Sequence, residues 1–312
     1  MGGRQTENNN KKLKYRRLAA VCGVVMLGCV IWLVVYLTGL GRAEDKIDDI
    51  RNNYVQDNTA APVGTKEPSG TSQTEQDAAR EAERKAQEEA RKAEEARKAL
   101  MEQYQVPDKE IDFAALQAEQ NEDIYAWITI PGTVIDYPVL QDPDEMDYYL
   151  DHNIDHSKPR PGCIYSQYIN SKEFTDRNTV LYGHYMRDGS MFADLHKYED
   201  PVFFEEHPYV YIYTESGILV YHIFAACQYS DIHLLLGIDI GTFDNFKKYI
   251  NSIYATGGLK DNYNQELKDE FDKDSCVLTL STWISPTGSS NKRWLISAVL
   301  EQEIAYEKKQ GE

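Results

Sequence analysis

The sequence is poor in cysteine, with five among 312 residues, and none lies in a C-x-x-C pair or at a metal-ligand spacing from histidine. Two of the five fall in the long apolar run near the N-terminus, which leaves an odd three for the rest of the chain: Cys22, Cys29, Cys163, Cys227 and Cys276. We therefore expect neither a disulfide framework nor a metal site, and no motif indicates a cofactor.

Positive charge is scarce after residue 42. Residues 43–312 contain 26 Lys or Arg against 50 Asp or Glu, a net charge of −24, whereas residues 1–42 sum to +6. A body this acidic repels phosphate backbones, so nucleic-acid binding is excluded as a function class.

One long apolar run is present, the 23 uncharged residues Leu18–Leu40. As a helix it measures about 34 Å, enough to cross a bilayer, and it is long for a cleaved signal peptide, which is the alternative. Basic residues 11–17 precede it, so the positive-inside rule keeps residues 1–17 in the cytoplasm and places the rest of the chain outside. The sequence predicts a single-pass protein of the cell membrane.

Two spacers follow the apolar run. Residues 41–72 are polar and rich in Asp, Asn, Thr, Gly and Pro, which is typical of a flexible linker. Residues 73–104 are dominated by Ala, Glu, Lys and Arg with acid-first i,i+4 pairs such as Glu81–Lys85, which predicts a long charged helix. We interpret it as a solvated stalk, with weak self-association as a coiled coil as the alternative.

Residues 105–312 change to short strand-like runs between turn signals. Eight runs rich in Ile, Val, Tyr and Thr predict a mainly β domain, a closed or nearly closed eight-stranded barrel with added helices. The expected strands are 126–130, 134–140, 162–166, 179–183, 209–213, 219–228, 276–282 and 294–300, and the expected helices are 112–121, 191–196 and 243–254.

Four stretches within this domain carry a more specific pattern. They are DIYAWITIPGTVIDYPVLQ (123–141), NTVLYGHYMRDGSMFADLHKY (178–198), CVLTLSTW (276–283) and NKRWLISAVL (291–300). In this order and spacing they resemble the class B sortases, membrane-anchored cysteine transpeptidases of Gram-positive bacteria. The resemblance covers roughly residues 108–302.

The resemblance implies a sortase-type barrel and a reaction at the C-terminal sorting motif of surface proteins. A cysteine thiolate attacks a threonine carbonyl of that peptide, and an amine of a peptidoglycan precursor or a pilin resolves the acyl-enzyme. Carried over by position, His184 is the acid/base and Arg293 holds the carbonyl and the developing oxyanion. Tyr182 and Ser281 match substrate-binding positions.

The sequence departs from the family at the nucleophile. The family motif ends TLxTC, whereas this chain reads TLSTW, so Trp283 occupies the nucleophile position. An indole is a donor-only group that cannot form the acyl-enzyme. Cys276 lies seven residues away along the expected strand, about 23 Å, and is expected to be a small core residue. Cys163 and Cys227 are expected to be buried thiols.

Three readings remain open. The first is a sortase-fold protein that has lost transpeptidation and keeps a peptide-binding groove. The second is an active sortase in which Trp283 reflects an engineered or erroneous replacement of cysteine. The third is a non-catalytic structural module on the cell surface.

Overall fold

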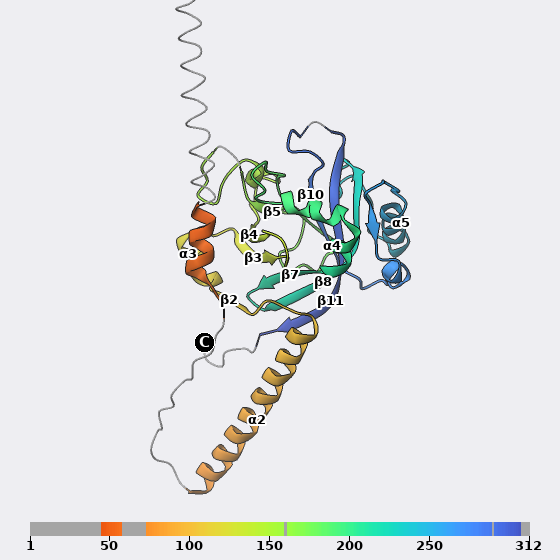
Figure 1. The fold of residues 1–312 in the computed structure, drawn as a ribbon. Helices are drawn as coiled ribbons and strands as arrows, with labels where there is room; N and C mark the ends of the chain where they lie inside the picture. The colour runs from red at the N-terminus through yellow and green to blue at the C-terminus, as the bar shows by residue number, and fades with distance from the viewer. Residues whose placement is uncertain (1–44, 58–72, 159–160, 289, 307–312) are drawn as a thin grey trace, which may run out of the picture.

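The computed structural model describes residues 45–57, 73–158, 161–288 and 290–306, and its centre is a closed β-barrel (Figure 1). Neighbouring strands run in the order β11-β10-β6-β5-β4-β3-β7-β8, and β8 pairs again with β11, which closes an eight-stranded barrel. The barrel strands are β3 (Ile124–Thr129), β4 (Asp136–Leu140), β5 (Ile164–Ser166), β6 (Asn178–Tyr182), β7 (Tyr209–Thr214), β8 (Gly217–Ser230), β10 (Val277–Trp283) and β11 (Lys292–Ala305). Each of them coincides with one of the eight expected strands, so the closed barrel is confirmed.

The pairing directions position the site. Most neighbours are antiparallel, but β6 and β10 are parallel, although almost a hundred residues separate them in the chain. A parallel pair needs a long crossover, and the segment between them supplies it with β7, β8 and α5 (Phe243–Tyr254). As a result, β6 and β10 end at the same edge of the barrel.

Strand alternation separates an inner core from an outer face. On β10, Leu278 and Leu280 point into the barrel, where they pack with Trp294 and Ile296 of β11. Val277 and its same-face neighbours point outward, and part of this face is covered by α5. Side chains of a strand alternate between the faces, so Ser281 and Trp283 also lie on the outer face.

The barrel domain contains short helices close to the sequence positions where we expected them. α3 (Phe113–Glu119) begins at Asp112, whose side chain accepts from the Ala115 amide at 2.9 Å. The expected helix 191–196 is the 3-10 helix η2 (Ala193–Glu199), and α5 has its expected bounds. The remaining short elements are η1 (Tyr148–Leu150), α4 (Pro201–Glu206), β9 (Asn262–Tyr263), which pairs with β8, and η3 (Glu266–Asp269).

The flexible-linker prediction is wrong for residues 45–57. Residues 45–54 form a helix against the barrel, the orange-red helix of Figure 1, and Ile50 is buried there at 1% exposure. β1 (Val55–Asp57) follows and pairs antiparallel with β2 (Lys109–Ile111). Polar residues dominate this stretch, which is why its composition predicts a linker. The segment folds because a few of its apolar residues pack against core residues that are distant in the chain.

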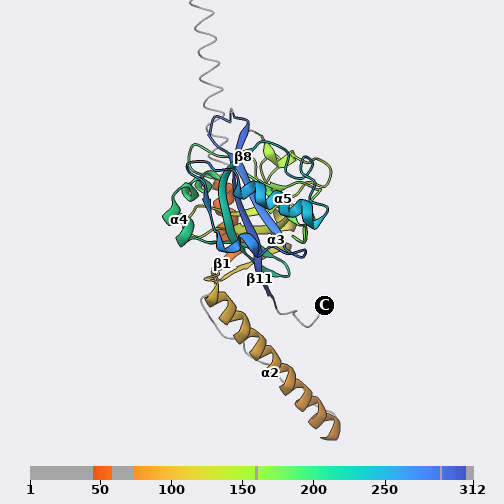
Figure 2. The same ribbon diagram turned by 90° about the vertical axis from the view of Figure 1, so that its right-hand side faces the viewer.

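The predicted charged helix is found as α2 (Gln73–Gln103), but its role as a stalk has to be corrected. Asp57 pairs with Lys109, so the chain lies beside the barrel both before and after α2. The 31-residue helix, about 46 Å long, extends away from the barrel in both views (Figures 1 and 2). α2 is therefore an arm, because residues 45–57 already hold the chain against the barrel before it.

No helix in the described ranges is long and apolar enough to cross a membrane. The predicted span Leu18–Leu40 and the cytoplasmic residues 1–17 lie outside those ranges.

Candidate functional site

The end of β10 carries residue 283 between β6 and β11. Trp283 pairs with Arg293 of β11, and Ser281 pairs with both Leu295 of β11 and Tyr182 of β6. Paired residues lie on the same face of a sheet, so Tyr182, Ser281, Trp283 and Arg293 all face outward.

His184 follows β6 by two residues and is tied to the same edge. The Gly183 amide donates to the Ser281 carbonyl at 3.2 Å, and Thr282 Oγ1 donates to the Gly183 carbonyl at 2.8 Å. These two hydrogen bonds extend the β6–β10 contact past the last strand pair. The structure thus brings the five predicted site residues to one end of three adjacent strands.

The His184 ring is buried, at 5% exposure, and its Nε2 lies 2.6 Å from the Leu150 carbonyl oxygen. A carbonyl only accepts, so Nε2 carries the hydrogen, and the basic lone pair of the neutral ring is on Nδ1. The His184 carbonyl in turn accepts from the Phe192 amide at 3.0 Å. The first contact fixes the orientation of the ring, and the second fixes the backbone that carries it.

The Trp283 indole occupies the space beside Arg293. The guanidinium carbon lies 4.9 Å from the ring centroid, a cation–π contact. Gly288, in the β10–β11 loop, packs so closely that a Cβ there would lie 1.9 Å from Trp283 Cζ3. The half-buried indole therefore fills the position between the guanidinium and the loop, where a cysteine would leave an open space.

Aromatic side chains continue the face beyond Arg293. Tyr182 stacks on Tyr165 with ring centroids 5.5 Å apart, and Tyr165 donates to Asp147 Oδ1 at 3.0 Å. Burial raises the pKa of Tyr182, Asp147 raises it further, and the Arg293 guanidinium opposes them. The hydroxyl stays neutral at physiological pH, which suits a peptide groove more than a charged ligand.

The described cysteines lie away from residue 283. Cys227 of β8 is fully buried, two strands or about 10 Å from Ser281, and burial raises its pKa to about 12. Cys163 is buried before β5, where burial raises its pKa strongly. Cys276 precedes the opposite end of β10 and is half-buried rather than the core residue expected, and burial raises its pKa too. None of the three is a low-pKa nucleophile.

Sequence reasoning missed His196 and Glu199 of η2. His196 Nε2 lies 2.9 Å from the Trp283 carbonyl oxygen, and its Nδ1 lies 2.8 Å from Glu199 Oε1. The i,i+3 spacing of a histidine and an acid in a short helix was the available signal, but only the fold brings η2 against the end of β10.

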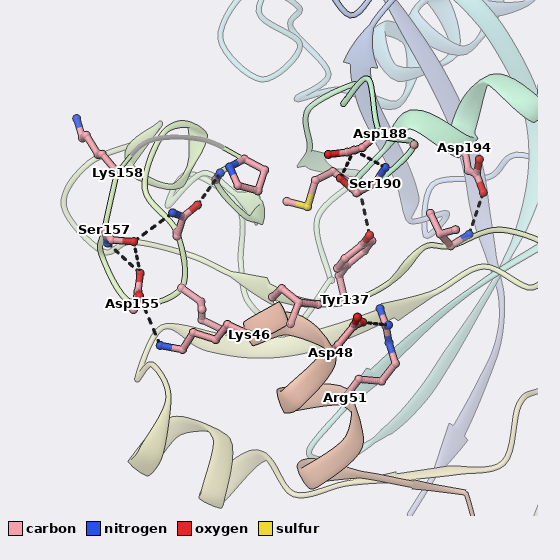
Figure 3. A pocket seen from close by; sticks show the side chains of 18 of the residues that line it. Lys46, Asp48, Arg51, Tyr137, Asp155, Ser157, Lys158, Asp188, Ser190 and Asp194 are labelled. Atoms are coloured by element: carbon pink, nitrogen blue, oxygen red, sulfur yellow. Dashed lines mark hydrogen bonds and ion pairs between the residues drawn. The ribbon is translucent and has the colours of Figure 1, made fainter. Parts of the chain in front are cut away.

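A cavity of about 590 Å³ is lined by none of the five predicted site residues (Figure 3). It lies between the helix 45–54, the segment before β5 and the loop after His184. Several of its charges pair within its own walls: Lys46 with Asp155 at 3.7 Å, Arg51 with Asp48 at 2.7 Å, and Lys197 with Asp194 at 2.8 Å. The cavity therefore does not present a concentrated charge of one sign.

Over the described residues, no group of three or more His, Cys, Asp or Glu side chains is arranged to hold a metal ion.

Comparisons with known proteins agree with this geometry. No family model matches the chain. Sortase B of Listeria monocytogenes is 40% identical over 164 residues, which cover 52% of this chain and 63% of that protein, a little less than two thirds of its length.

Solved structures extend the likeness to the fold. A Bacillus anthracis sortase B structure is 30% identical with a TM-score of 0.51, covering 61% of this chain and 84% of that one. A Streptococcus pyogenes class B sortase involved in pilus biogenesis is 26% identical with a TM-score of 0.51, covering 61% and 98%. From its sequence relatives and its barrel alike, the chain belongs to the class B sortase family.

Proposed function

We propose that this chain is a sortase homologue that binds sorting-motif peptides on its outer barrel face but does not perform thiol transpeptidation. The observation that carries the proposal is Trp283 at the end of β10, paired with Arg293 of β11 and at the same barrel edge as His184. We further propose that the span Leu18–Leu40 holds the domain at the outer surface of the cell membrane.

The chemistry of the family reaction explains why we expect no transpeptidation. Acyl transfer needs a thiolate that attacks the threonine carbonyl, a group that accepts and returns a proton, and a donor for the oxyanion. In our proposal His184 and Arg293 retain the second and third roles. The indole at 283 has no nucleophilic lone pair, so the first step cannot occur there.

Peptide binding is the function that the remaining features support. Half-buried Tyr182 lies near Arg293 and stacks on buried Tyr165, and Ser281 lies next to Tyr182 on the same face. A Staphylococcus aureus sortase B of the same fold, 24% identical, has been solved as a substrate complex. The peptidoglycan or pilin amine that completes the family reaction remains a proposed partner only of a cysteine-containing form.

The experiment compares the full chain with its Trp283→Cys and Trp283→Ala variants on a panel of quenched sorting-motif peptides. We expect no cleavage by the wild type, cleavage by Trp283→Cys, and binding without cleavage by Trp283→Ala. Trp283→Ala is the matched control, because it removes the indole and supplies no thiol.

Two outcomes would contradict the proposal. Cleavage by the wild type that survives Trp283→Ala and is lost in Ser281→Ala would indicate a serine mechanism. A folded Trp283→Cys variant that neither binds nor cleaves any peptide would favour the structural-module reading, since the groove would then have been lost with the nucleophile.

A further inference from the structure

The carbonyl group of residue 283 has an unusual partner. At the end of β10 it lies 2.9 Å from Nε2 of His196, which belongs to η2. The side chain of His196 is 13% exposed, so this hydrogen bond is largely shielded from solvent. The contact holds the backbone at the centre of the site from outside the three strands that form it.

Both nitrogens of the His196 ring face oxygen acceptors. Nδ1 lies 2.8 Å from Glu199 Oε1, opposite the contact of Nε2 with the Trp283 carbonyl. A neutral imidazole carries one N–H, whereas the imidazolium carries two. The carbonyl of residue 283 can only accept, so Nε2 carries a hydrogen wherever this contact forms.

Neighbouring groups hold the His196 ring in place. Burial would raise the pKa of Glu199, but His196 and Lys260 outweigh it and lower the pKa, so this carboxylate is ionised. Tyr185 and Trp294 both stack on the ring, with centroids 4.4 and 5.5 Å away. Lys260 also pairs with Glu199. These contacts restrict the rotation of the ring, so Nε2 stays directed at the Trp283 carbonyl.

We propose that His196 is a positioning residue, which donates from Nε2 to the carbonyl of residue 283 and so fixes the backbone that carries this side chain beside Arg293. The proposal rests on the proposed function only in placing the site at residue 283. Without this donor the end of β10 loses its contact with η2, and side chain 283 takes up more than one orientation.

The test uses ¹⁹F NMR of the full chain labelled with 5-fluorotryptophan, with the Trp283 signal assigned by Trp283→Phe. In the wild type we expect one sharp signal. In His196→Gln, whose side-chain amide can donate to the carbonyl, the signal should stay sharp and close to its wild-type position. In His196→Ala, which has no donor, the signal should broaden or split.

The matched control is His222→Gln. His222 also pairs with a glutamate, Glu301, at 2.7 Å, but it lies on the barrel wall away from residue 283. Its replacement should leave the Trp283 signal unchanged. A Trp283 signal that is unchanged in His196→Ala would overturn the proposal, as would equal broadening in His196→Ala and His222→Gln.

A kinetic measurement applies if Trp283→Cys proves active. Adding His196→Ala to it should lower kcat by about 10- to 100-fold with little change in KM, and His196→Gln should restore most of the loss at neutral pH. The NMR result does not require activity, so failure of this proposal and failure of the proposed function are distinguishable.

Discussion

Replacing Asp136 with asparagine should release the N-terminal segment from the barrel. Asp136 begins β4, and its Oδ1 accepts from Lys109 Nζ at 2.5 Å and from Trp127 Nε1 and Thr129 Oγ1, each at 2.8 Å. Its Oδ2 lies 3.2 Å from Arg51 Nε, and its carbonyl accepts from Arg51 Nη2 at 2.8 Å. One carboxylate therefore joins the helix 45–54, β2, β3 and β4.

The magnitude follows from the burial of its partners. The Lys109 side chain is 11% exposed and that of Asp136 is 21% exposed. Breaking a fully buried ion pair costs about 3–5 kcal/mol, because the remaining charge stays desolvated. Allowing for partial exposure, we expect Asp136→Asn to lower the free energy of unfolding by about 2–4 kcal/mol. That corresponds to a fall in Tm of about 4–16 °C for a domain of this size.

The assay is thermal unfolding together with limited trypsin digestion at Arg51, which becomes accessible when the helix 45–54 leaves the barrel. The control is Asp48→Asn, because Asp48 also pairs with Arg51, at 2.7 Å, but is 59% exposed. An exposed pair contributes about 0–1 kcal/mol. Equal losses of stability in the two variants, or unchanged cleavage at Arg51 in Asp136→Asn, would refute the reasoning.

The same carboxylate predicts a pH dependence. Burial alone would raise the pKa of Asp136, but Lys109, Trp127 and Thr129 outweigh it, so the folded-state pKa lies below the usual 3.8. A lowered pKa gives stability that is present above about pH 4 and lost as the pH falls through the folded-state value. The stability difference between wild type and Asp136→Asn should therefore shrink with acidification below about pH 4.

Three further predictions concern the site, the thiols and the topology. Gly288→Ala, at φ +70°, should lower the free energy of unfolding by about 2–4 kcal/mol in the wild type. In the Trp283→Ala background the loss should be only about 1–2 kcal/mol, because the clash with the indole is then absent. Additive losses in a double-mutant cycle of denaturant unfolding would contradict the packing. With a thiol reagent and peptide mapping, half-buried Cys276 should label before Cys163 in the native protein, and the reverse order would contradict their burial. Protease added to intact protoplasts should digest the barrel, whereas protection would argue against the proposed membrane topology.

Local patterning was sufficient for most of the barrel. Runs of β-branched and aromatic residues between Gly, Pro and Asp turns predicted its eight strands, and apolar residues on one helix face predicted α5, because these signals lie within each element. The same sequence motifs assigned His184, Trp283 and Arg293 to one site, and the register of β6, β10 and β11 brings these residues together.

Tertiary structure alone decided what depends on distant partners. Residues 45–57 look like a linker by composition, and they fold because Ile50 and Arg51 meet core residues and Asp136 that are far away in the chain. α2 was correctly predicted as a helix, but its role changed from stalk to arm once β1 paired with β2. His196 carries no motif of its own, and it reaches residue 283 only because η2 packs against the end of β10. Secondary structure is encoded by neighbours in sequence, whereas these contacts join residues about 50 or more positions apart, which no local pattern specifies.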